Sequence, residues 1–167
     1  MTTANTYEIK PATEADIPDM LAMIKELAIY EKEPDAVVNT PEMMKENLFV
    51  KKYAEAFVAR TPSGQAVGLA LYFFTYSTWL GVPGLYLEDL YVVPEHRGGG
   101  LGKTLFGYLG EVAKERGCQR VEWRVLKWNT PSKDFYEKRL GSEPQSEWEG
   151  ERLEGPEAIE RLIALKN

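Results

Sequence analysis

Hydrophobic and polar positions are patterned most clearly over residues 85–108, where the spacing changes from that of a strand to that of a helix. An apolar run over residues 85–93 ends at a proline turn, and a basic, glycine-rich loop follows. Leu101, Leu105 and Leu109 then recur at helical spacing. The pattern predicts a strand, a loop, and a helix whose first turn is nearly bare backbone.

The rest of the chain alternates between the same two kinds of pattern. Two helices, a meander of strands, and then strand and helix twice more predict an α/β (α+β) fold. We expect helices to flank one mixed sheet in a single domain over residues 1–167. Helices are expected from residue 17 to near residues 30–33, over 41–48, 101–116 and 131–139, and from 156 onward. Strands are expected over residues 7–9, 54–60, 66–76, 85–93, 120–126 and 151–153.

Charge and composition narrow the range of partners. The chain carries 26 acidic and 20 basic residues, a net charge of −6, which argues against nucleic acid and suits a small cationic partner. The single cysteine, Cys118, cannot form an internal disulfide, which suits a reducing compartment. No apolar run approaches membrane-spanning length, and the first residues lack a targeting pattern. We therefore expect a cytoplasmic protein, with the nucleus left open, and no membrane partner.

The glycine-rich loop has the chemistry of a phosphate-binding site. Backbone N–H groups at a helix N-terminus lack intrahelical partners and carry the positive end of the helix dipole. Glycines leave no Cβ over these amides, and an arginine beside them adds planar donors. The loop therefore predicts a pyrophosphate cradle. Its residues are Arg97, Gly98, Gly99, Gly100, Leu101, Gly102 and Lys103.

Two familiar nucleotide motifs do not fit this loop. Gly102-Lys103-Thr104 ends as the P-loop of nucleotide-binding proteins ends, but that motif requires a glycine where Arg97 stands. The dinucleotide fingerprint G-x-G-x-x-G cannot be aligned with these glycines either.

Adjacent carboxylates stand inside the apolar strand before the loop. Glu88 and Asp89 are costly to bury in a run of Leu, Tyr and Val unless they are hydrogen-bonded or functional. The two-residue period of a strand predicts that they point to opposite faces of the sheet. A solvated sheet edge is the alternative interpretation.

The Arg-x-x-Gly-x-Gly pattern after a strand resembles the signature of the GCN5-related N-acetyltransferases, the GNAT superfamily. That resemblance implies a mixed, mostly antiparallel sheet, with acetyl-coenzyme A as co-substrate and no metal. It implies that the loop holds the pyrophosphate and that backbone N–H groups of Leu90, Tyr91 and Val92 polarise the thioester. The segment Asn129 to Tyr136 matches the family pattern in which the tyrosine acts as general acid, so Tyr136 would protonate the coenzyme thiolate. Asn129, Ser132 and Tyr136 would all contact the coenzyme.

Further motifs are similar to those of the spermidine/spermine (diamine) N1-acetyltransferases. The resemblance implies that Glu88 activates the amine through water and that Tyr30, Glu31, Trp79 and Asp89 line the acceptor site. It also implies a homodimer. The motifs are Ile24-Lys25-Glu26-Leu27-Ala28, Tyr30-Glu31, Tyr72-Phe73-Phe74-Thr75-Tyr76, Trp79-x-Gly81, Tyr86-Leu87-Glu88-Asp89-Leu90-Tyr91-Val92 and Trp128-Asn129.

One departure from the polyamine-specific pattern bears on the substrate. Ser77-Thr78-Trp79 stands where that branch has an aspartate two places before the tryptophan, and it resembles the thialysine N-epsilon-acetyltransferase branch. We expect direct acetyl transfer in a ternary complex to a small primary amine such as thialysine, a diamine or polyamine, or a related amino acid. A P-loop-like nucleotide-binding protein and a non-catalytic coenzyme A-binding or partner-regulating module remain the alternatives.

Overall fold

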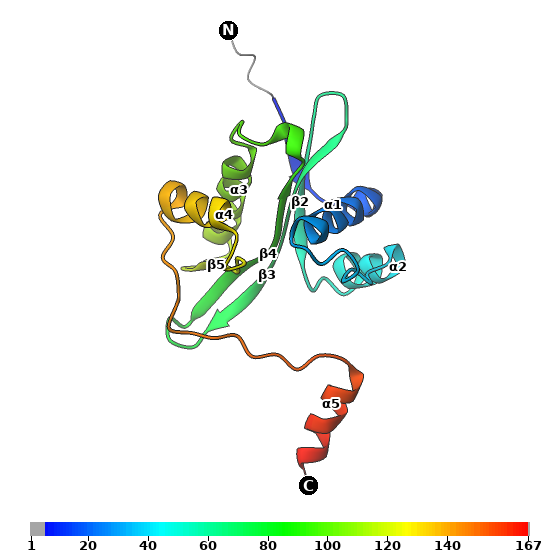
Figure 1. The fold of residues 1–167 in the computed structure, drawn as a ribbon, viewed down its shortest axis with the longest axis vertical. Coiled ribbons are helices and arrows are strands. Elements are labelled where there is room, and N and C mark those ends of the chain that lie inside the picture. Colours follow the sequence, from blue (N-terminus) through cyan, green and yellow to red (C-terminus); the bar gives the residue numbers. More distant parts are fainter. Residues whose placement is uncertain (1–5, 167) are drawn as a thin grey trace. The chain divides into compact units, whose positions relative to one another are not determined.

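The computed structural model describes residues 6–166. It contains one five-stranded sheet with the order β1-β2-β3-β4-β5 (Figure 1). The first four strands pair antiparallel with their neighbours, and β4 pairs parallel with β5. The prediction of a mixed, mostly antiparallel sheet is therefore confirmed. The strands are β1 (Glu8–Pro11), β2 (Glu55–Arg60), β3 (Ala66–Ser77), β4 (Val82–Val92) and β5 (Val121–Trp123).

Two strand predictions need correction. The last strand, expected over residues 120–126, covers only Val121–Trp123, because its pairing with β4 ends at Leu87, where β4 becomes irregular. The strand expected over residues 151–153 does not form. That short stretch is charged and flanked by glycines, so it has little apolar surface with which to pack on a neighbouring strand.

The helices differ in how their N-termini are capped. The side chain of Thr40 accepts a hydrogen bond from the Met43 backbone N–H at 3.2 Å, and Gly100, at φ 89°, stands before α3. The helices are α1 (Ile17–Tyr30), α2 (Pro41–Met44), α3 (Leu101–Glu115), α4 (Thr130–Asp134) and α5 (Pro156–Ile163). Wider π-helical turns Lys45–Val50 and Phe135–Leu140 continue α2 and α4, and short 3-10 turns cover Glu14–Asp16, Pro94–His96 and Ala164–Lys166.

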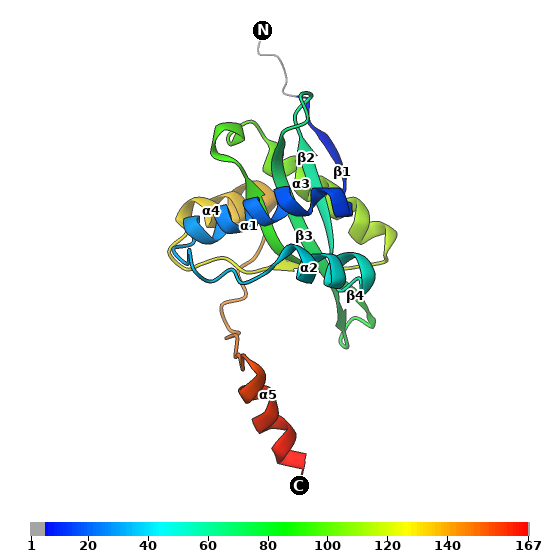
Figure 2. The ribbon, with the colours of Figure 1, turned by 90° about the vertical axis from the view of Figure 1, so that its right-hand side faces the viewer.

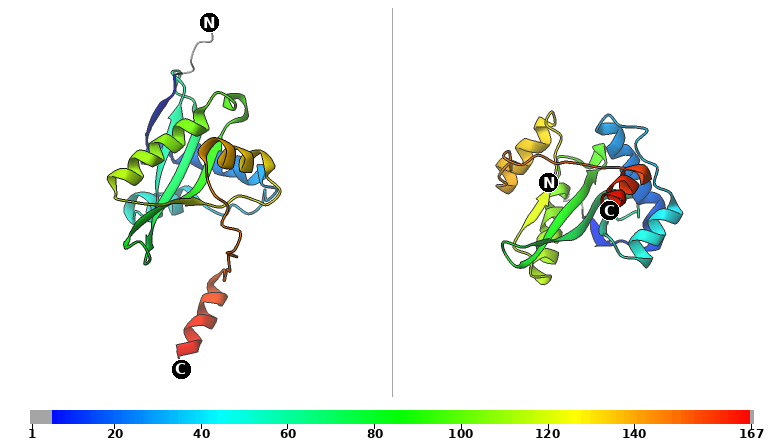
Figure 3. Two further views of the ribbon diagram at one scale, coloured as in Figure 1. Left: turned by 90° about the vertical axis from the view of Figure 1, so that its left-hand side faces the viewer. Right: turned by 90° about the horizontal axis from the view of Figure 1, so that it is seen from below.

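The sheet has a hydrophobic core on each face. Helix α3 covers one face, and α1 and α2 cover the other, as Figures 1 and 2 and the left view of Figure 3 show. On the α3 side, Leu101, Leu105 and Leu109 pack on the strands. On the α1 side, Met20 and Met44 are almost completely buried against them. The helical spacing of these residues is what positions α1 and α3 on the sheet.

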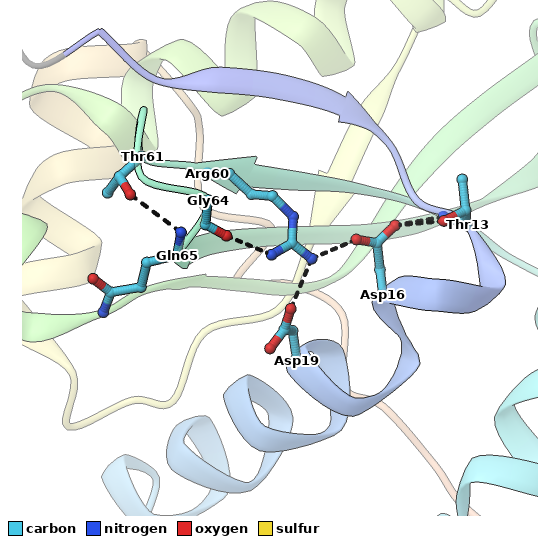
Figure 4. A network of polar contacts seen from close by, with 7 residues as sticks. All are labelled: Thr13, Asp16, Asp19, Arg60, Thr61, Gly64 and Gln65. Carbon is cyan, nitrogen blue, oxygen red and sulfur yellow. Dashed lines mark hydrogen bonds and ion pairs between the residues drawn. The ribbon is translucent and has the colours of Figure 1, made fainter.

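An arginine connects the end of β2 to the start of α1 (Figure 4). One terminal nitrogen of Arg60 lies 2.6 Å from Asp16 Oδ1 and 2.7 Å from Asp19 Oδ2. The other donates to the Gly64 carbonyl in the β2–β3 turn at 2.8 Å. Asp16 also accepts a hydrogen bond from the Thr13 backbone N–H at 2.7 Å, so this contact network holds the first helix against the hairpin.

The chain divides into two compact units, Met1–Trp128 and Asn129–Asn167. The first unit contains the whole sheet with α1, α2 and α3, and the second contains α4 and α5. The expectation of one domain over residues 1–167 stays a prediction. Within residues 6–166, none of the helices combines the length and the hydropathy that crossing a membrane requires.

Candidate active site

An irregularity in β4 reorganises the predicted carboxylate pair. Leu71 of β3 pairs with Asp89, but the next residue, Tyr72, pairs with Leu87. Glu88 is therefore an extra residue between two paired positions, which defines a β-bulge. One extra residue reverses the face to which the following side chains point.

This reversal is visible in which hydrophobic core each side chain of β4 joins. Leu87, before the bulge, belongs to the core under α3, whereas Tyr91, after it, belongs to the core under α1. Glu88 follows Leu87 directly, so its side chain points to the opposite face, the α1 side. Asp89 is two residues before Tyr91, so its side chain points to the same face as Tyr91, which is also the α1 side. The prediction that they point to opposite faces was wrong because it assumed an uninterrupted two-residue period.

A third carboxylate, Glu31, comes from the end of α1. Burial, followed by the nearby charges of Glu88 and Glu31, raises the pKa of Asp89 to about 6. Burial also raises the pKa of Glu31 above its ordinary value. A cation placed among these groups would favour their ionised forms and relieve this repulsion. The acid cluster, defined as Glu31, Glu88 and Asp89, therefore has the electrostatics of a primary ammonium site.

An aromatic pair borders the end of α1. The rings of Tyr30 and Trp128 lie 6.1 Å apart between centroids, and the Lys32 ammonium lies 4.3 Å from the Trp128 ring centroid. Trp128 is 44% exposed and was not among the predicted site residues. Its position directly before Asn129 is the signal in the sequence that could have suggested it.

Beyond Leu87, β4 has a strand partner on one side only. Pairing with β5 stops at Leu87, while pairing with β3 continues to Val92. Within residues 6–166, no strand is paired with the other edge of this segment. Because backbone groups in an antiparallel pair alternate in direction, some N–H groups of Leu90, Tyr91 and Val92 point to that open edge. The arrangement is compatible with the predicted contact to a thioester, which stays a prediction.

The glycine loop leaves the start of α3 uncovered. Gly98 and Gly100 have φ of 79° and 89°, a conformation that side chains rarely adopt. A Cβ at Gly99 or Gly102 would meet no heavy atom within 4 Å, so packing does not require glycine there. Their missing side chains keep backbone amides accessible beside the exposed Lys103. These residues fit a pyrophosphate. Their contact with the coenzyme stays a prediction.

The Arg97 side chain lies on the α1 face of the sheet. Its Nε donates to the Val92 carbonyl at 2.7 Å, and its guanidinium carbon lies 5.5 Å from the Tyr30 ring centroid and 5.3 Å from that of Tyr91. Tyr91 in turn donates its hydroxyl hydrogen to Glu26 at 2.8 Å. The guanidinium is thus held by the strand and by α1.

A pocket of about 530 Å³ opens beside this arginine. Its lining contains the side chains of Glu26, Tyr30, Tyr91, Glu95 and Arg97. It therefore carries acidic, basic and aromatic groups at once.

Trp79 and the acid cluster of the same chain lie far apart. It occupies the β3–β4 turn, where Ser77 pairs with Val82, and its side chain is 85% exposed. At ~3.3 Å per residue, Val82 and Glu88 are roughly 20 Å apart along β4. The structure therefore does not bring Trp79 to the carboxylates, and its predicted role in acceptor binding stays a prediction.

Three predicted coenzyme residues belong to the second unit. The buried Asn129 accepts a hydrogen bond from the Ser132 backbone N–H at 3.3 Å, which caps α4. Tyr136 is half-buried, and its ring lies 5.6 Å from that of Phe135. Their predicted contacts with the coenzyme, and the role of Tyr136 as general acid, stay predictions.

Known proteins with similar sequences and folds identify the class. Residues 21–141 match the acetyltransferase (GNAT) family. A V. cholerae integron cassette protein has the same fold, with a TM-score of 0.77 and 24% identity, covering 94% of this chain and 97% of that chain. The chain belongs to the GNAT acetyltransferase family and is an acyltransferase.

Closer relatives refine this assignment. The chain is 39% identical over 165 residues to the thialysine N-epsilon-acetyltransferase of Sus scrofa, covering 92% of this chain and 95% of the relative. It is 33% identical over 153 residues to the spermidine/spermine N(1)-acetyltransferase-like protein 1 of Homo sapiens, covering 87% of this chain and 22% of the relative. Within the superfamily it belongs with the diamine acetyltransferases, closer to the thialysine branch, as the sequence motifs indicate.

Proposed function

We propose that this enzyme transfers the acetyl group of acetyl-coenzyme A to the terminal amine of a small cationic acceptor, in a ternary complex. The observation that carries the proposal is the bulge in β4, which places Glu88 and Asp89 on one face beside an unpaired strand edge. Amine activation and thioester binding can then take place on the same segment of β4.

The acetyl donor would lie along the open edge of β4. Its pyrophosphate would contact the backbone amides of the loop from Arg97 to Lys103, which the glycines leave uncovered. Its thioester carbonyl would accept hydrogen bonds from backbone N–H groups of residues 90–92, and these would stabilise the oxyanion of the tetrahedral intermediate. Asn129 and Ser132 would contact other parts of the coenzyme.

The chemistry requires three proton transfers. The acceptor enters as an ammonium ion, held by Glu31 and Asp89, and Glu88 takes its proton through a water molecule. The free amine attacks the thioester carbon, a C–N bond forms and the C–S bond breaks. Tyr136 gives its proton to the departing thiolate, and the acetylated amine leaves after losing its remaining extra proton to solvent.

Thialysine is the acceptor that we place first. The sulfur atom in its side chain withdraws electrons, so its terminal amine is less basic than that of lysine and is easier to deprotonate. Ser77 supports this choice, because it stands where the polyamine-specific branch has an aspartate, whose carboxylate would bind a long polyamine. The similarity to the thialysine N-epsilon-acetyltransferase of Sus scrofa supports it further.

A panel of acceptors at saturating acetyl-coenzyme A tests the proposal. We expect acetylation of thialysine to exceed that of lysine, spermidine and spermine, and Glu88→Gln and Tyr136→Phe each to lower kcat by about 100-fold. A clear preference for spermidine would overturn the choice of acceptor. Unchanged turnover of Tyr136→Phe at saturating amine would overturn the acid assignment.

We further propose that the enzyme is a cytoplasmic homodimer. The exposed aromatic side chains of Tyr76 and Trp79 on the β3–β4 hairpin support an interface, since large apolar groups on a surface often mark one. Size-exclusion chromatography with light scattering distinguishes a dimer from a monomer, and a monomer at micromolar concentration would overturn the dimer.

A further inference from the structure

The pocket beside Arg97 contains charges of both signs, which a site for a simple polyamine does not need. Glu26 and Glu95 contribute carboxylates, Tyr30 and Tyr91 contribute aromatic rings, and Arg97 contributes a guanidinium. A ligand that matches this lining carries a carboxylate and an ammonium close together. The α-carbon end of an amino acid has that composition.

The guanidinium of Arg97 is oriented for such a ligand. It lies against the rings of Tyr30 and Tyr91, on the face of the sheet that α1 covers. Helix α3, which follows the glycine loop directly, packs on the other face of the sheet. The backbone of the loop and the Arg97 side chain can therefore serve different ligands.

We propose that Arg97 binds the α-carboxylate of an amino acid acceptor, while its backbone and the following glycines serve the coenzyme. This inference rests on the proposed acetyl transfer and adds to it a specificity-determining residue. A guanidinium has five N–H donors in a planar fork, so the bond from Nε to the Val92 carbonyl and a hydrogen bond to the Tyr91 hydroxyl still leave terminal donors for a carboxylate. Glu26 and Glu95 supply acceptors for the α-ammonium on the same pocket wall.

The pocket and the acid cluster lie at a suitable spacing for one acceptor. Asp89 and Tyr91 occupy alternate positions on the same face of β4, so they are about 7 Å apart along the strand. Tyr30 lines the pocket, and Glu31 follows it directly in the sequence. An amino acid with a side chain as long as that of lysine can place its carboxylate at Arg97 and its terminal ammonium at the acid cluster.

This arrangement also discriminates against polyamines. A diamine or polyamine of similar length can place its second ammonium group at Glu26 and Glu95, but it leaves the Arg97 guanidinium without a carboxylate and beside a like charge. An amino acid instead places a carboxylate there. Arg97 thus gives a reason for preferring an amino acid that is independent of the residue at position 77.

The test compares two acceptors that differ only in the carboxylate: thialysine and its decarboxylated analogue, bis(2-aminoethyl) sulfide. Steady-state kinetics at saturating acetyl-coenzyme A give kcat/KM for each with the wild-type enzyme and with Arg97→Gln and Arg97→Lys. Lys103→Gln is the matched control, because it removes a loop cation that lies outside the pocket lining. Thermal melts verify that each variant is folded.

We expect the wild type to prefer thialysine and Arg97→Gln to reduce that preference by about tenfold or more, as the loss of a charge-assisted contact implies. Arg97→Lys, which keeps the charge but not the fork, should fall between the two. Lys103→Gln should raise the KM for acetyl-coenzyme A and keep the preference. Equal losses for both acceptors in Arg97→Gln would overturn the proposal and leave the arginine to the coenzyme. Failure of the wild type to acetylate either amine would instead overturn the proposed function.

Discussion

Tyr91 donates its hydroxyl hydrogen to Glu26 at 2.8 Å and so connects β4, the strand of the bulge, to α1, the helix that ends just before Glu31. The Tyr91 side chain is buried, and its hydroxyl reaches an exposed carboxylate. This hydrogen bond therefore helps to fix the position of α1 relative to β4, the two elements beside which the residues of the acid cluster lie.

Removal of this hydroxyl should loosen the connection between α1 and β4 without disturbing the core. We expect Tyr91→Phe to lower the free energy of unfolding by about 1–2 kcal/mol, since Glu26 can be solvated once its partner is lost. The ring stays under the Arg97 guanidinium. Urea denaturation measures the change, and Tyr53→Phe, an exposed tyrosine in a loop, is the control that should change little. Equal effects of the two substitutions would contradict a connecting role for Tyr91.

The acid cluster should make the unliganded enzyme less stable above pH 6. The folded-state pKa of Asp89 is about 6, above its reference value of 3.8, so the folded protein binds more protons than the unfolded chain between these values. Stability then falls as pH rises through this window and reaches a plateau above it, at a cost of up to about 3 kcal/mol. Water at this half-buried side chain will reduce that figure.

The substitution Asp89→Asn removes the charge and should reverse this effect. We expect its melting temperature to exceed that of the wild type at pH 8 and to approach it at pH 4. Glu111→Gln, an exposed change on α3, is the control that should show no such convergence. A wild-type advantage at pH 8 would mean that Asp89 has a stabilising partner in the free enzyme.

Two loop glycines should respond in opposite ways to an added methyl group. Gly100 adopts a φ of 89°, so Gly100→Ala should cost about 1–2 kcal/mol of stability. Gly102 lies in the first turn of α3 with open space around it, so Gly102→Ala should be neutral or stabilise by up to about 1 kcal/mol. The new methyl group of Gly102→Ala would nevertheless cover an amide of the proposed pyrophosphate site.

The functional measurement separates folding from coenzyme binding. Isothermal titration with coenzyme A should show weaker binding to Gly102→Ala than to the wild type despite its equal or greater stability. Gly107→Ala, further along the same helix and also without a neighbour within 4 Å, is the control that should bind normally. Normal binding by Gly102→Ala would argue against a ligand on that part of the loop.

The sequence was a good guide to the elements and a poorer one to their irregularities. Helical spacing predicted α1 and α3, because it is a local pattern. The bulge at Glu88 was not predictable, since it appears only in the register between β4 and β3. The side of the sheet on which Arg97 lies was hidden for the same reason, because contacts with Tyr30 and Tyr91 are set by tertiary packing.

The Arg60 network should be a pH-dependent support of the first helix. Burial pushes the pKa of Asp16 upward, but hydrogen bonds from Arg60 and Thr13 outweigh it and bring the pKa below its ordinary value of 3.8. A depressed folded-state pKa contributes stability above the unfolded pKa, and that contribution is lost as pH falls through the folded value. We expect Arg60→Met to cost about 1–2 kcal/mol at pH 7, because these charges are partly solvated.

The cost should shrink on acidification, because a protonated Asp16 no longer needs the guanidinium. Urea unfolding at pH 7 and pH 2 should therefore show a large difference between wild type and Arg60→Met at the first pH and a small one at the second, because only the second lies well below the ordinary pKa of 3.8. Lys45→Met, which breaks the more exposed ion pair with Glu14, should change little at either pH. A constant deficit at both pH values would mean that Arg60 acts mainly through its bond to the Gly64 carbonyl, which does not titrate.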